Sequence, residues 1–322
     1  MNEFVIMEDF PKSEIEFDQR FLDPSTCYQY LFTMKWPHGF RCRKCAYQNY
    51  WVSKRHIYIC QRCQHNHSLT AGTIMDSSKK PITYWFKALW WFTSRKSGIN
   101  AVNLQELLGL GSYTTAWVWL QKLRRCTIRK DRERLSGTVE VDEFFIGGQK
   151  SGKRGRGSTG KTIVVAAVER TGGKLGRIRL KVIPNCSSEA LVAFITDAVE
   201  PGSTVCTDGW KGYYGLDNTL YNHCQVFQNR VSTKDSVLAG VHLIVSFVKR
   251  LIIGTYHGRF DPQYLQNYLD EYVFRFNRRN SKSIGKKFMR IVQQVVNSTK
   301  ITFSQLIHNT CRPSDYPLGL SE

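Results

Sequence analysis

Three carboxylates interrupt a stretch whose other residues are typical of a core strand. Residues 139–148 read VEVDEFFIGG, which places Glu140, Asp142 and Glu143 among valine and phenylalanine. Side chains alternate along a strand, so Glu140 and Asp142 share one face and the two valines take the other. Burying an ionised carboxylate costs several kcal/mol unless a cation or hydrogen bonds compensate it. We therefore interpret Asp142 as a ligand of a divalent metal; an edge strand with solvated acids is the alternative.

A second acid, Asp208, ends another apolar run, STVCTDGW at residues 203–210. The glycine after it lets a ligand come close to the backbone. Carboxylates on two strands of a mixed sheet can hold a pair of hard cations about 3.5 to 4 Å apart, which activate a nucleophile and stabilise the leaving oxygen in phosphodiester displacement. Asp142 and Asp208 together predict this chemistry, whereas Asp208 alone would also fit a solvated acid.

A third ligand is expected from a helix packed across these strands. Residues 241–253 read VHLIVSFVKRLII, and at about 100° per residue His242, Ser246 and Lys249 share one face of an otherwise apolar helix. This polar stripe predicts that His242 is a metal ligand and that Lys249 contacts phosphate. A structural role for the histidine is the alternative.

The elements that would position these residues begin after Gly137, where the pattern changes to short apolar runs between glycine-rich turns. The first three runs predict a three-stranded meander, followed by an amphipathic helix and a fourth strand that ends in Asp208. Further helices are expected in the rest of the chain. The expected strands are 138–146, 162–169, 177–183 and the run ending at Asp208, and the expected helices are 188–199, 241–253, 262–278 and 285–297.

Four cysteines nearer the N-terminus have the spacing of a metal site. Cys42 and Cys45 form one C-x2-C pair, Cys60 and Cys63 form another, and fourteen residues separate them. Two such pairs place four thiolates around one Zn²⁺, and a closed site of this kind folds a small module that has no core of its own. Four unrelated buried cysteines are the alternative.

The surface of this zinc ribbon is left for binding. His65 and His67 are expected there as polar groups rather than as ligands. The basic and aromatic side chains that suit contact with nucleic acid or protein are Arg41, Arg43, Lys44, Lys54, Arg55, Arg62, Tyr47, Tyr50, Trp51 and Tyr58.

Helical periodicity follows from residue 81 to residue 134. Residues 104–125 read LQELLGLGSYTTAWVWLQKLRR, which predicts a helix, a turn at 109–111, an N-cap at Ser112 and a second helix over 113–125. This is the spacing of a DNA-reading helix-turn-helix, although two helices of any bundle have the same pattern. The basic end of the second helix favours DNA.

The charge balance indicates a polyanionic partner. The 322 residues carry a formal net charge of +20 and a pI near 9.6, which favours nucleic acid over a membrane surface. Residues 149–181 contain ten lysines or arginines and one acid, as a flexible clamp on phosphates or a solvated basic loop would. No apolar run reaches the roughly 18 to 20 residues of a membrane span and no signal peptide is apparent, so we expect a soluble, intracellular protein.

Taken together, these blocks resemble the DDE-superfamily transposases of bacterial insertion sequences, in the zinc-ribbon-bearing branch related to the eukaryotic Merlin transposons. The resemblance covers most of the chain. It rests on the cysteine ribbon at 42–63, GTVEVDEFFIGG at 137–148, VCTDGWKGY at 205–213, VKRLIIGTYHG at 248–258 and YLQNYLDEYVFRFNRR at 264–279.

The resemblance implies an α/β protein with an RNase H-like catalytic core, a mixed sheet with flanking helices, preceded by the zinc ribbon and the helix-turn-helix-like region. It implies two catalytic cations, Mg²⁺ or Mn²⁺, and DNA strand cleavage followed by strand transfer. Asp142 and Asp208 match the first two acids of the family. His242 stands where many relatives have glutamate, seven residues before Lys249, so we read the site as two aspartates and a histidine; Asp235 lies in a polar loop and is not favoured. An imidazole ligand shifts the preference toward Mn²⁺.

The resulting domain prediction has five parts. They are an acidic N-terminal helical segment at 1–35, the zinc ribbon at 36–75, a helix-turn-helix-like DNA-binding region at 76–135, the RNase H-like catalytic domain at 136–300 and a C-terminal tail at 301–322.

The predicted partner is double-stranded DNA, both the element ends and the target, bound by a homo-oligomer in the cytoplasm at the bacterial nucleoid and without a membrane. The side chains predicted to contact DNA are Arg124, Arg125, Lys153, Arg154, Arg156, Arg250, Arg278 and Arg279. Two other functions remain open. The chain could be a DNA-binding relative that has lost catalysis, as the absent glutamate permits, or an RNase H-like nuclease without strand transfer.

Overall fold

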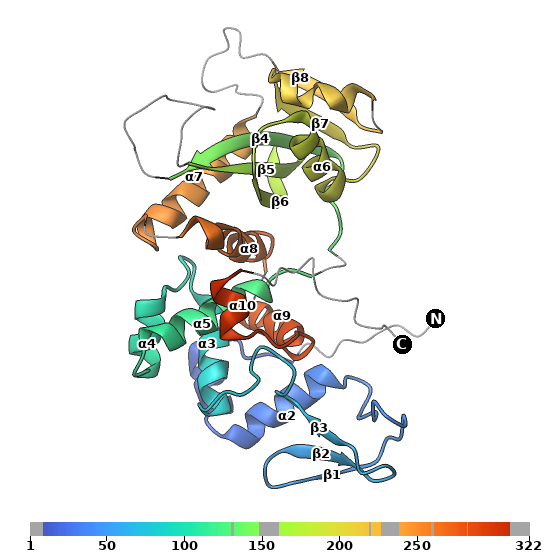
Figure 1. Ribbon diagram of the computed structural model, residues 1–322, viewed down its shortest axis with the longest axis vertical. Helices are drawn as coiled ribbons and strands as arrows, with labels where there is room; N and C mark the ends of the chain where they lie inside the picture. The colour runs from blue at the N-terminus through green and yellow to red at the C-terminus, as the bar shows by residue number, and fades with distance from the viewer. Residues whose placement is uncertain are drawn as a thin grey trace. The chain divides into compact units, whose positions relative to one another are not determined.

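The apolar runs after Gly137 form a five-stranded mixed sheet in the computed structural model of the protein (Figure 1). The strand order is β6-β5-β4-β7-β8. The first three strands along the chain pair antiparallel, which confirms the predicted meander, whereas β7 is parallel to β4 and β8 is parallel to β7. The strands are β4 (Thr138–Ile146), β5 (Thr162–Thr171), β6 (Lys174–Ile183), β7 (Thr204–Asp208) and β8 (Asn222–Val226).

The structure describes residues 9–129, 132–147, 161–218, 220–226, 238–258, 261–281 and 283–309. The chain divides into two units: Met1–Lys130 joined by Asn280–Glu322, and Asp131–Arg279, which contains the sheet. Among the described residues, no helix combines the length and the apolar character that crossing a membrane requires.

Helices cover both faces of the sheet. On one face, Val139 and Val141 pack in a core with the amphipathic helix α6 (Ser188–Ala198) and the 3-10 helix η1 (Lys211–Asn218). On the other face, α7 (Ala239–Gly254) packs on β4 and β5, and α8 (Leu265–Phe276) packs on β6. This mixed sheet between helices is the predicted RNase H-like core.

Amide side chains of the segment over 264–279 cover the edge of the sheet. Gln266 accepts a hydrogen bond from the backbone N–H of Val182 at 2.8 Å, and Asn277 accepts one from Ile178 at 2.8 Å. An uncovered edge strand would present unpaired backbone groups to other chains. The helix predicted over 262–278 is in fact a 3-10 turn, η2 (Pro262–Tyr264), followed by α8.

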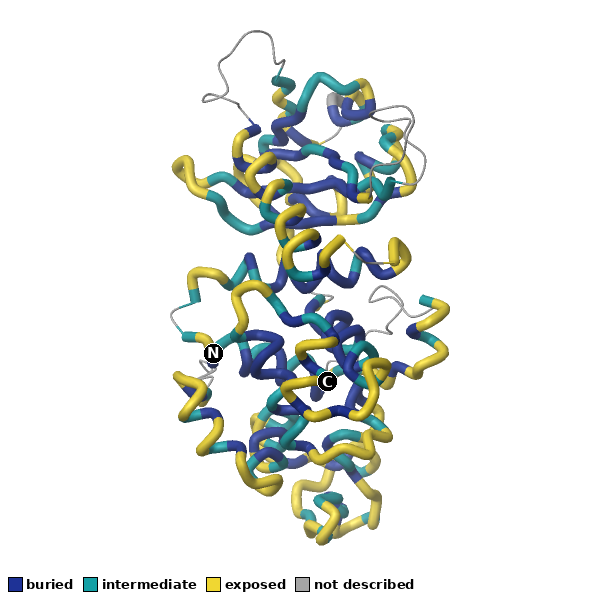
Figure 2. The backbone as a smooth tube through the Cα atoms, turned by 90° about the vertical axis from the view of Figure 1, so that its left-hand side faces the viewer, coloured by how far each residue is buried: buried dark blue, intermediate teal, exposed yellow. Residues whose placement is uncertain are grey.

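The first unit combines a three-stranded ribbon with a helical bundle (Figure 1). Buried segments of the backbone lie inside each of the two units (Figure 2). The predicted helix pair is present: α4 begins after the Asn100 N-cap and ends at Gly109, whose φ of 58° suits glycine, and α5 follows Ser112. The elements are α1 (Glu14–Arg20), α2 (Pro24–Lys35), β1 (Tyr50–Val52), β2 (Ile57–Cys60), β3 (Asn66–Ser68), α3 (Ile82–Ser94), α4 (Ala101–Leu108), α5 (Tyr113–Arg125), α9 (Ile284–Val296) and α10 (Phe303–Ile307).

Helix α9 belongs to this first unit, although we expected the catalytic domain to extend to residue 300. The second unit ends at Arg279. Helix α9 packs on α2 and α3, and its fully buried Phe288 meets the rings of Phe17 at 5.4 Å and Trp90 at 5.7 Å. The chain therefore leaves the first unit, forms the sheet and returns.

Candidate metal centre and DNA-contact residues

Two neighbouring strands bring the predicted aspartates together. Strands β4 and β7 are parallel, with Glu140 opposite Cys206, so Asp142 and Asp208 each lie two residues further along on the same face. One carboxylate oxygen from each of Asp142, Glu143 and Asp208 lies within 4.8 Å of the other two. This carboxylate cluster stands where the sequence predicts a divalent-metal site.

Glu143 is the member of the carboxylate cluster that sequence reasoning missed. Strand alternation places its Cβ on the opposite face from Asp142, but alternation does not describe the reach of a glutamate side chain. Glu143 is buried and accepts a hydrogen bond from the Tyr213 hydroxyl at 2.8 Å. Burial, followed by the charge of Glu143, raises the pKa of Tyr213 well above its ordinary value, so the phenol stays protonated as a donor.

Helix α7 brings the predicted histidine to the carboxylate cluster. The Nε2 atom of His242 lies 3.4 Å from Oδ2 of Asp142, and the two side chains are 42% and 18% exposed. Lys249 and Arg250 are exposed further along the same helix, and the Arg250 guanidinium lies 5.7 Å from the centre of the Phe247 ring.

The donor atoms suit a hard divalent cation. Carboxylate oxygens are the ligands that Mg²⁺ and Mn²⁺ prefer, and an imidazole is accepted more readily by Mn²⁺. Three carboxylates within 4.8 Å would repel one another strongly without a cation or another compensating charge. The residues present therefore fit the cations that the resemblance implies.

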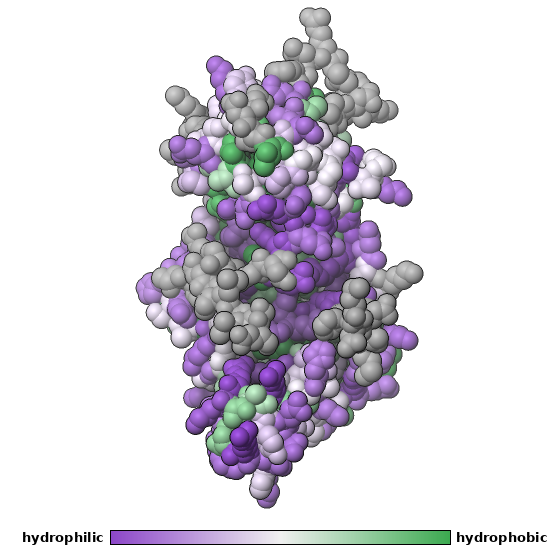
Figure 3. All heavy atoms as spheres, turned by 90° about the vertical axis from the view of Figure 1, so that its right-hand side faces the viewer, coloured by the Kyte–Doolittle hydropathy of each residue, from purple (hydrophilic) through white to green (hydrophobic). Residues whose placement is uncertain are grey.

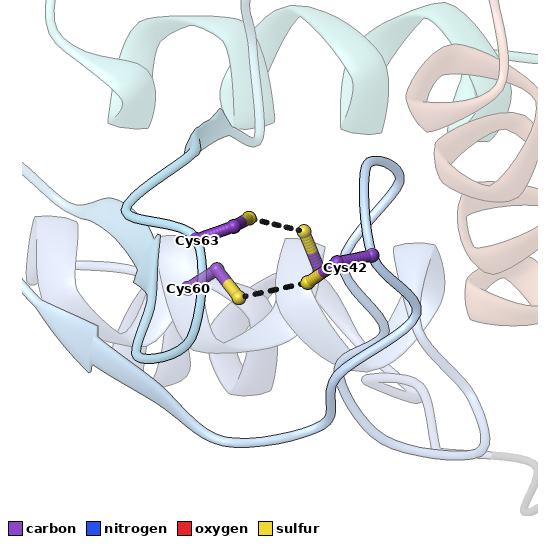
Figure 4. A group of neighbouring side chains, drawn as sticks. Cys42, Cys60 and Cys63 are labelled. Carbon is purple, nitrogen blue, oxygen red and sulfur yellow. Dashed lines mark hydrogen bonds between the residues drawn. The ribbon is translucent and has the colours of Figure 1, made fainter.

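The four cysteines of the ribbon also converge (Figure 4). The Sγ atoms of Cys42 and Cys63 lie 3.5 Å apart, as do those of Cys45 and Cys60. In a tetrahedral Zn²⁺ site with Zn–S bonds of about 2.3 Å, neighbouring sulfurs lie about 3.8 Å apart. The four side chains therefore fit a structural zinc ion with little rearrangement.

Two similar turns hold these cysteines. Each C-x2-C pair is followed by a residue with positive φ, Ala46 at 59° and Gln64 at 57°. Their backbone N–H groups donate to the carbonyls of Cys42 at 2.9 Å and Cys60 at 3.0 Å, closing each turn around its sulfurs. Burial opposes ionisation of Cys60, yet the backbone N–H groups of Cys63 and Arg62 and the neighbouring sulfurs lower its pKa to about 7. At Cys45 the backbone N–H of Tyr47 favours the thiolate, but burial and the other three sulfurs raise its pKa, so the four thiols do not all ionise together without a cation.

The structure corrects two expectations about the ribbon surface. His67 is buried, not at the surface, and its Nε2 atom lies 3.4 Å from the sulfur of Cys42. Tyr58 is buried and Tyr50 is half-buried, because their rings pack against Phe32 of α2. The other basic and aromatic side chains expected at this surface are exposed: Arg41, Arg43, Lys44, Lys54, Arg55, Arg62, Tyr47 and Trp51.

The arginines predicted to contact DNA differ in their accessibility. Arg124 and Arg125 are only 1% and 3% exposed, and Arg125 donates to Asn309 at 2.8 Å. The end of α5 packs into the bundle, so burial argues against phosphate contact at either residue. Arg250 is exposed. Lys153, Arg154 and Arg156 lie outside the described residues.

Arg278 and Arg279 have local packing partners. Their guanidiniums lie 4.1 Å and 4.0 Å from the centres of the Phe274 and Phe276 rings. Arg279 also donates to the carbonyl of Gly176 at 3.1 Å, which ties the end of α8 to strand β6. These contacts help to hold both side chains, Arg279 is exposed, and contact of either arginine with DNA stays a prediction. Among the described residues, the face of the molecule drawn in Figure 3 carries mainly hydrophilic side chains.

Comparison with known proteins identifies two domains. Residues 134–277 match the model of the ISXO2-like transposase domain, and residues 22–66 match that of the transposase zinc-ribbon domain. No curated protein matches the chain. A crystal structure of a pre-cleavage Mos1 transpososome is similar at 15% identity over 70% of this chain and 82% of that chain, with a TM-score of 0.26.

Proposed function

The chain belongs to the DDE-superfamily transposases, with an ISXO2-like transposase domain and a transposase zinc ribbon, and on this premise we propose that it cuts and joins DNA. The proposed substrate is the double-stranded end of an insertion sequence. The proposed reaction is divalent-metal-dependent strand cleavage followed by transfer of the freed 3′ end to target DNA. The observation that carries the proposal is the gathering of Asp142, Glu143 and Asp208 within 4.8 Å.

Each side chain at the site has a proposed role. Asp142 is central, because it lies beside both the other carboxylates and His242. Asp142, Asp208 and His242 would hold two divalent cations, with Glu143 as an additional carboxylate. Bound there, the cations would make water a stronger nucleophile and neutralise charge that develops on the phosphodiester. Lys249 and Arg250, exposed on α7, would bind and orient the phosphates of the strand being cut.

The remaining parts would recognise DNA. A structural zinc ion would hold the ribbon, whose exposed basic and aromatic side chains suit a DNA backbone. The first turn of α5 carries the exposed residues Tyr113 and Thr114, at the position where a recognition helix reads base edges. We also propose the five-part domain division with one change, which is that the catalytic domain ends at Arg279. We further propose a homo-oligomer on DNA, because two ends must be joined, and action at the nucleoid in the cytoplasm.

Metal-dependent cleavage of element-end DNA tests this function. Wild-type protein with Mg²⁺ or Mn²⁺ should nick the terminal-repeat DNA and join the 3′ end to target DNA, while Asp142→Asn and Asp208→Asn should do neither. Asp197→Asn serves as the matched control. Asp197 lies on α6, and its carboxylate is 4.0 Å from the Arg132 guanidinium. If Asp142→Asn cuts as well as wild type, the assignment fails.

Variants at His242 separate the proposal from its two alternatives. We expect His242→Ala to lose activity and His242→Glu to retain it with a shift from Mn²⁺ toward Mg²⁺. A protein that binds the ends but leaves them uncut under every metal would be an inactive relative. One that nicks DNA but never joins the 3′ end would be a nuclease.

A further inference from the structure

A buried carboxylate next to the carboxylate cluster has an unassigned role. Glu140 lies two residues before Asp142 on the same face of β4, and only 4% of it is exposed. One of its oxygens pairs with Nε of Arg170 at 3.0 Å, and the other accepts a hydrogen bond from the backbone N–H of Val241 at 2.8 Å. Val241 directly precedes His242. Glu140 is thus bonded to the helix at the residue before the candidate ligand.

Helix α7 depends on this contact for its N-terminal end. The first N–H groups of any helix have no partner within the helix, and a negative charge near them is favourable. The N-cap position of α7 is Leu238, which has no side chain that accepts such a bond. The cap is instead supplied by Glu140 from the sheet.

Gly240 makes room for the cap. A Cβ atom at this position would lie 2.8 Å from Oε2 of Glu140 and 2.9 Å from Cδ of Arg170, closer than carbon atoms normally approach. A side chain at this position would displace the Glu140 carboxylate or the Arg170 side chain, so glycine leaves room for their contact with the helix. Gly254, at the other end of the same helix, has nothing within 4 Å of such an atom.

We propose that Glu140, held by Arg170, is a positioning residue that sets His242 against Asp142. The inference rests on the proposed function, because it concerns the metal site of that reaction. Two of the contacts between β4 and α7 lie close together: Glu140 binds Val241, and Asp142 lies 3.4 Å from His242. The two acids are two residues apart on the strand, and their partners are adjacent on the helix. Since the first fixes the start of the helix on the strand, it also fixes where the imidazole lies.

The chain offers a matched control for Glu140. Glu169 on β5 is also buried, pairs with Arg177 at 2.7 Å and accepts a backbone N–H bond from Ser136 at 2.9 Å. Its described contacts do not include α7. Glu140→Ala and Glu169→Ala therefore remove the same kind of group at similar burial, and only the first releases the helix that carries His242.

Mn²⁺ binding by the full chain, followed by electron paramagnetic resonance of the free ion, tests the proposal. We expect Glu140→Ala and Gly240→Ala to weaken Mn²⁺ binding about 10-fold, as loss of a residue that orients a ligand does, and Glu140→Gln, which keeps an acceptor oxygen, to weaken it less. Glu169→Ala and Gly254→Ala should bind like wild type. In a His242→Ala background, Glu140→Ala should cause no further loss, because it acts through that imidazole. Backbone hydrogen exchange over residues 239–246 without metal should be faster in Glu140→Ala than in wild type or Glu169→Ala.

The outcomes distinguish this inference from the proposed function. If wild type binds Mn²⁺ but Glu140→Ala and Gly240→Ala bind it equally well, or if the losses from Glu140→Ala and His242→Ala add, the positioning role is wrong and the metal centre stands. If wild type binds no Mn²⁺, the proposed function fails and this inference fails with it. Gly240→Ala perturbs the same contact from the helix side, so the test remains decisive if Glu140→Ala does not fold.

Discussion

Removing a carboxylate from the candidate metal site should stabilise the metal-free protein. Asp142, Glu143 and Asp208 place charged oxygens within 4.8 Å of one another. Two like charges at that distance repel by about 3.5 kcal/mol at an effective dielectric constant of about 20, and by about 0.9 kcal/mol in bulk water. Asp142 takes part in two such pairs. Its side chain is 18% exposed, so water screens part of this repulsion.

Asp142→Asn relieves the repulsion and can keep one hydrogen bond of the folded protein. Oδ1 of Asp142 accepts a hydrogen bond from the backbone N–H of Glu143 at 2.9 Å, and an asparagine oxygen can keep that bond. After discounting for screening, we expect the free energy of unfolding of the metal-free protein to rise by about 1 kcal/mol. In a unit of this size that raises the melting temperature by about 2 to 4 °C.

Thermal unfolding at pH 8 with and without Mn²⁺ measures the stability of the metal-free and the metal-bound protein. Mn²⁺ at 100 times its dissociation constant should stabilise wild type by about 2.7 kcal/mol, and Asp142→Asn should lose most of that gain. Asp197→Asn should match wild type in both conditions. A metal-free Asp142→Asn that melts below wild type, or one that keeps the full Mn²⁺ shift, would refute the reasoning.

Two further predictions concern groups away from this site. Elemental analysis should find one Zn²⁺ per chain. Cys60→Ser should lose the ion and show fast hydrogen exchange over residues 40–68, because the ion stabilises the fold of the ribbon. Unchanged zinc content in this variant would contradict the thiolate site. Burial raises the pKa of Asp270 from 3.8 to about 7, so between these values the unfolded chain binds fewer protons than the folded one. The free energy of unfolding should therefore fall from about pH 4 to about pH 7 and then level off, and Asp270→Asn should flatten that slope; a slope that survives the substitution would contradict this.

The strands and candidate ligands that the sequence predicts share a strong local signal. Alternation in β4 separates the valines of the core from Glu140 and Asp142 on the other face. Each C-x2-C pair closes a turn on its own backbone. Strand β8 has no such signal. It reads NHCQV and becomes a strand by pairing in parallel with β7. When a segment becomes a strand because it pairs with a neighbouring strand, its own residues show little alternation or strand propensity.

The burial and contacts of individual side chains were harder to predict than the helices and strands. Arg124 and Arg125 end a helix with basic residues, which reads as a solvated terminus, but this end of α5 packs within the bundle. Contact of Arg279 with DNA stays a prediction, but the sequence did not indicate that its long apolar stem and planar head would stack on Phe276 and bind backbone carbonyls. Net charge predicts a polyanionic partner for the whole chain, but it does not say which arginines face that partner.

The three acids of β4 have different electrostatic partners, which explains why a core strand keeps them. Glu140 has a guanidinium and a helix N-terminus, so its charge is compensated within the fold. Glu143 has the Tyr213 phenol, a neutral donor that stabilises its carboxylate without cancelling the charge. Asp142 has the imidazole of His242, which carries charge only when protonated. The carboxylates of Asp142, Glu143 and Asp208 meet at the end of β4 nearest Asp208, and a divalent cation is a partner that suits such a group of oxygens.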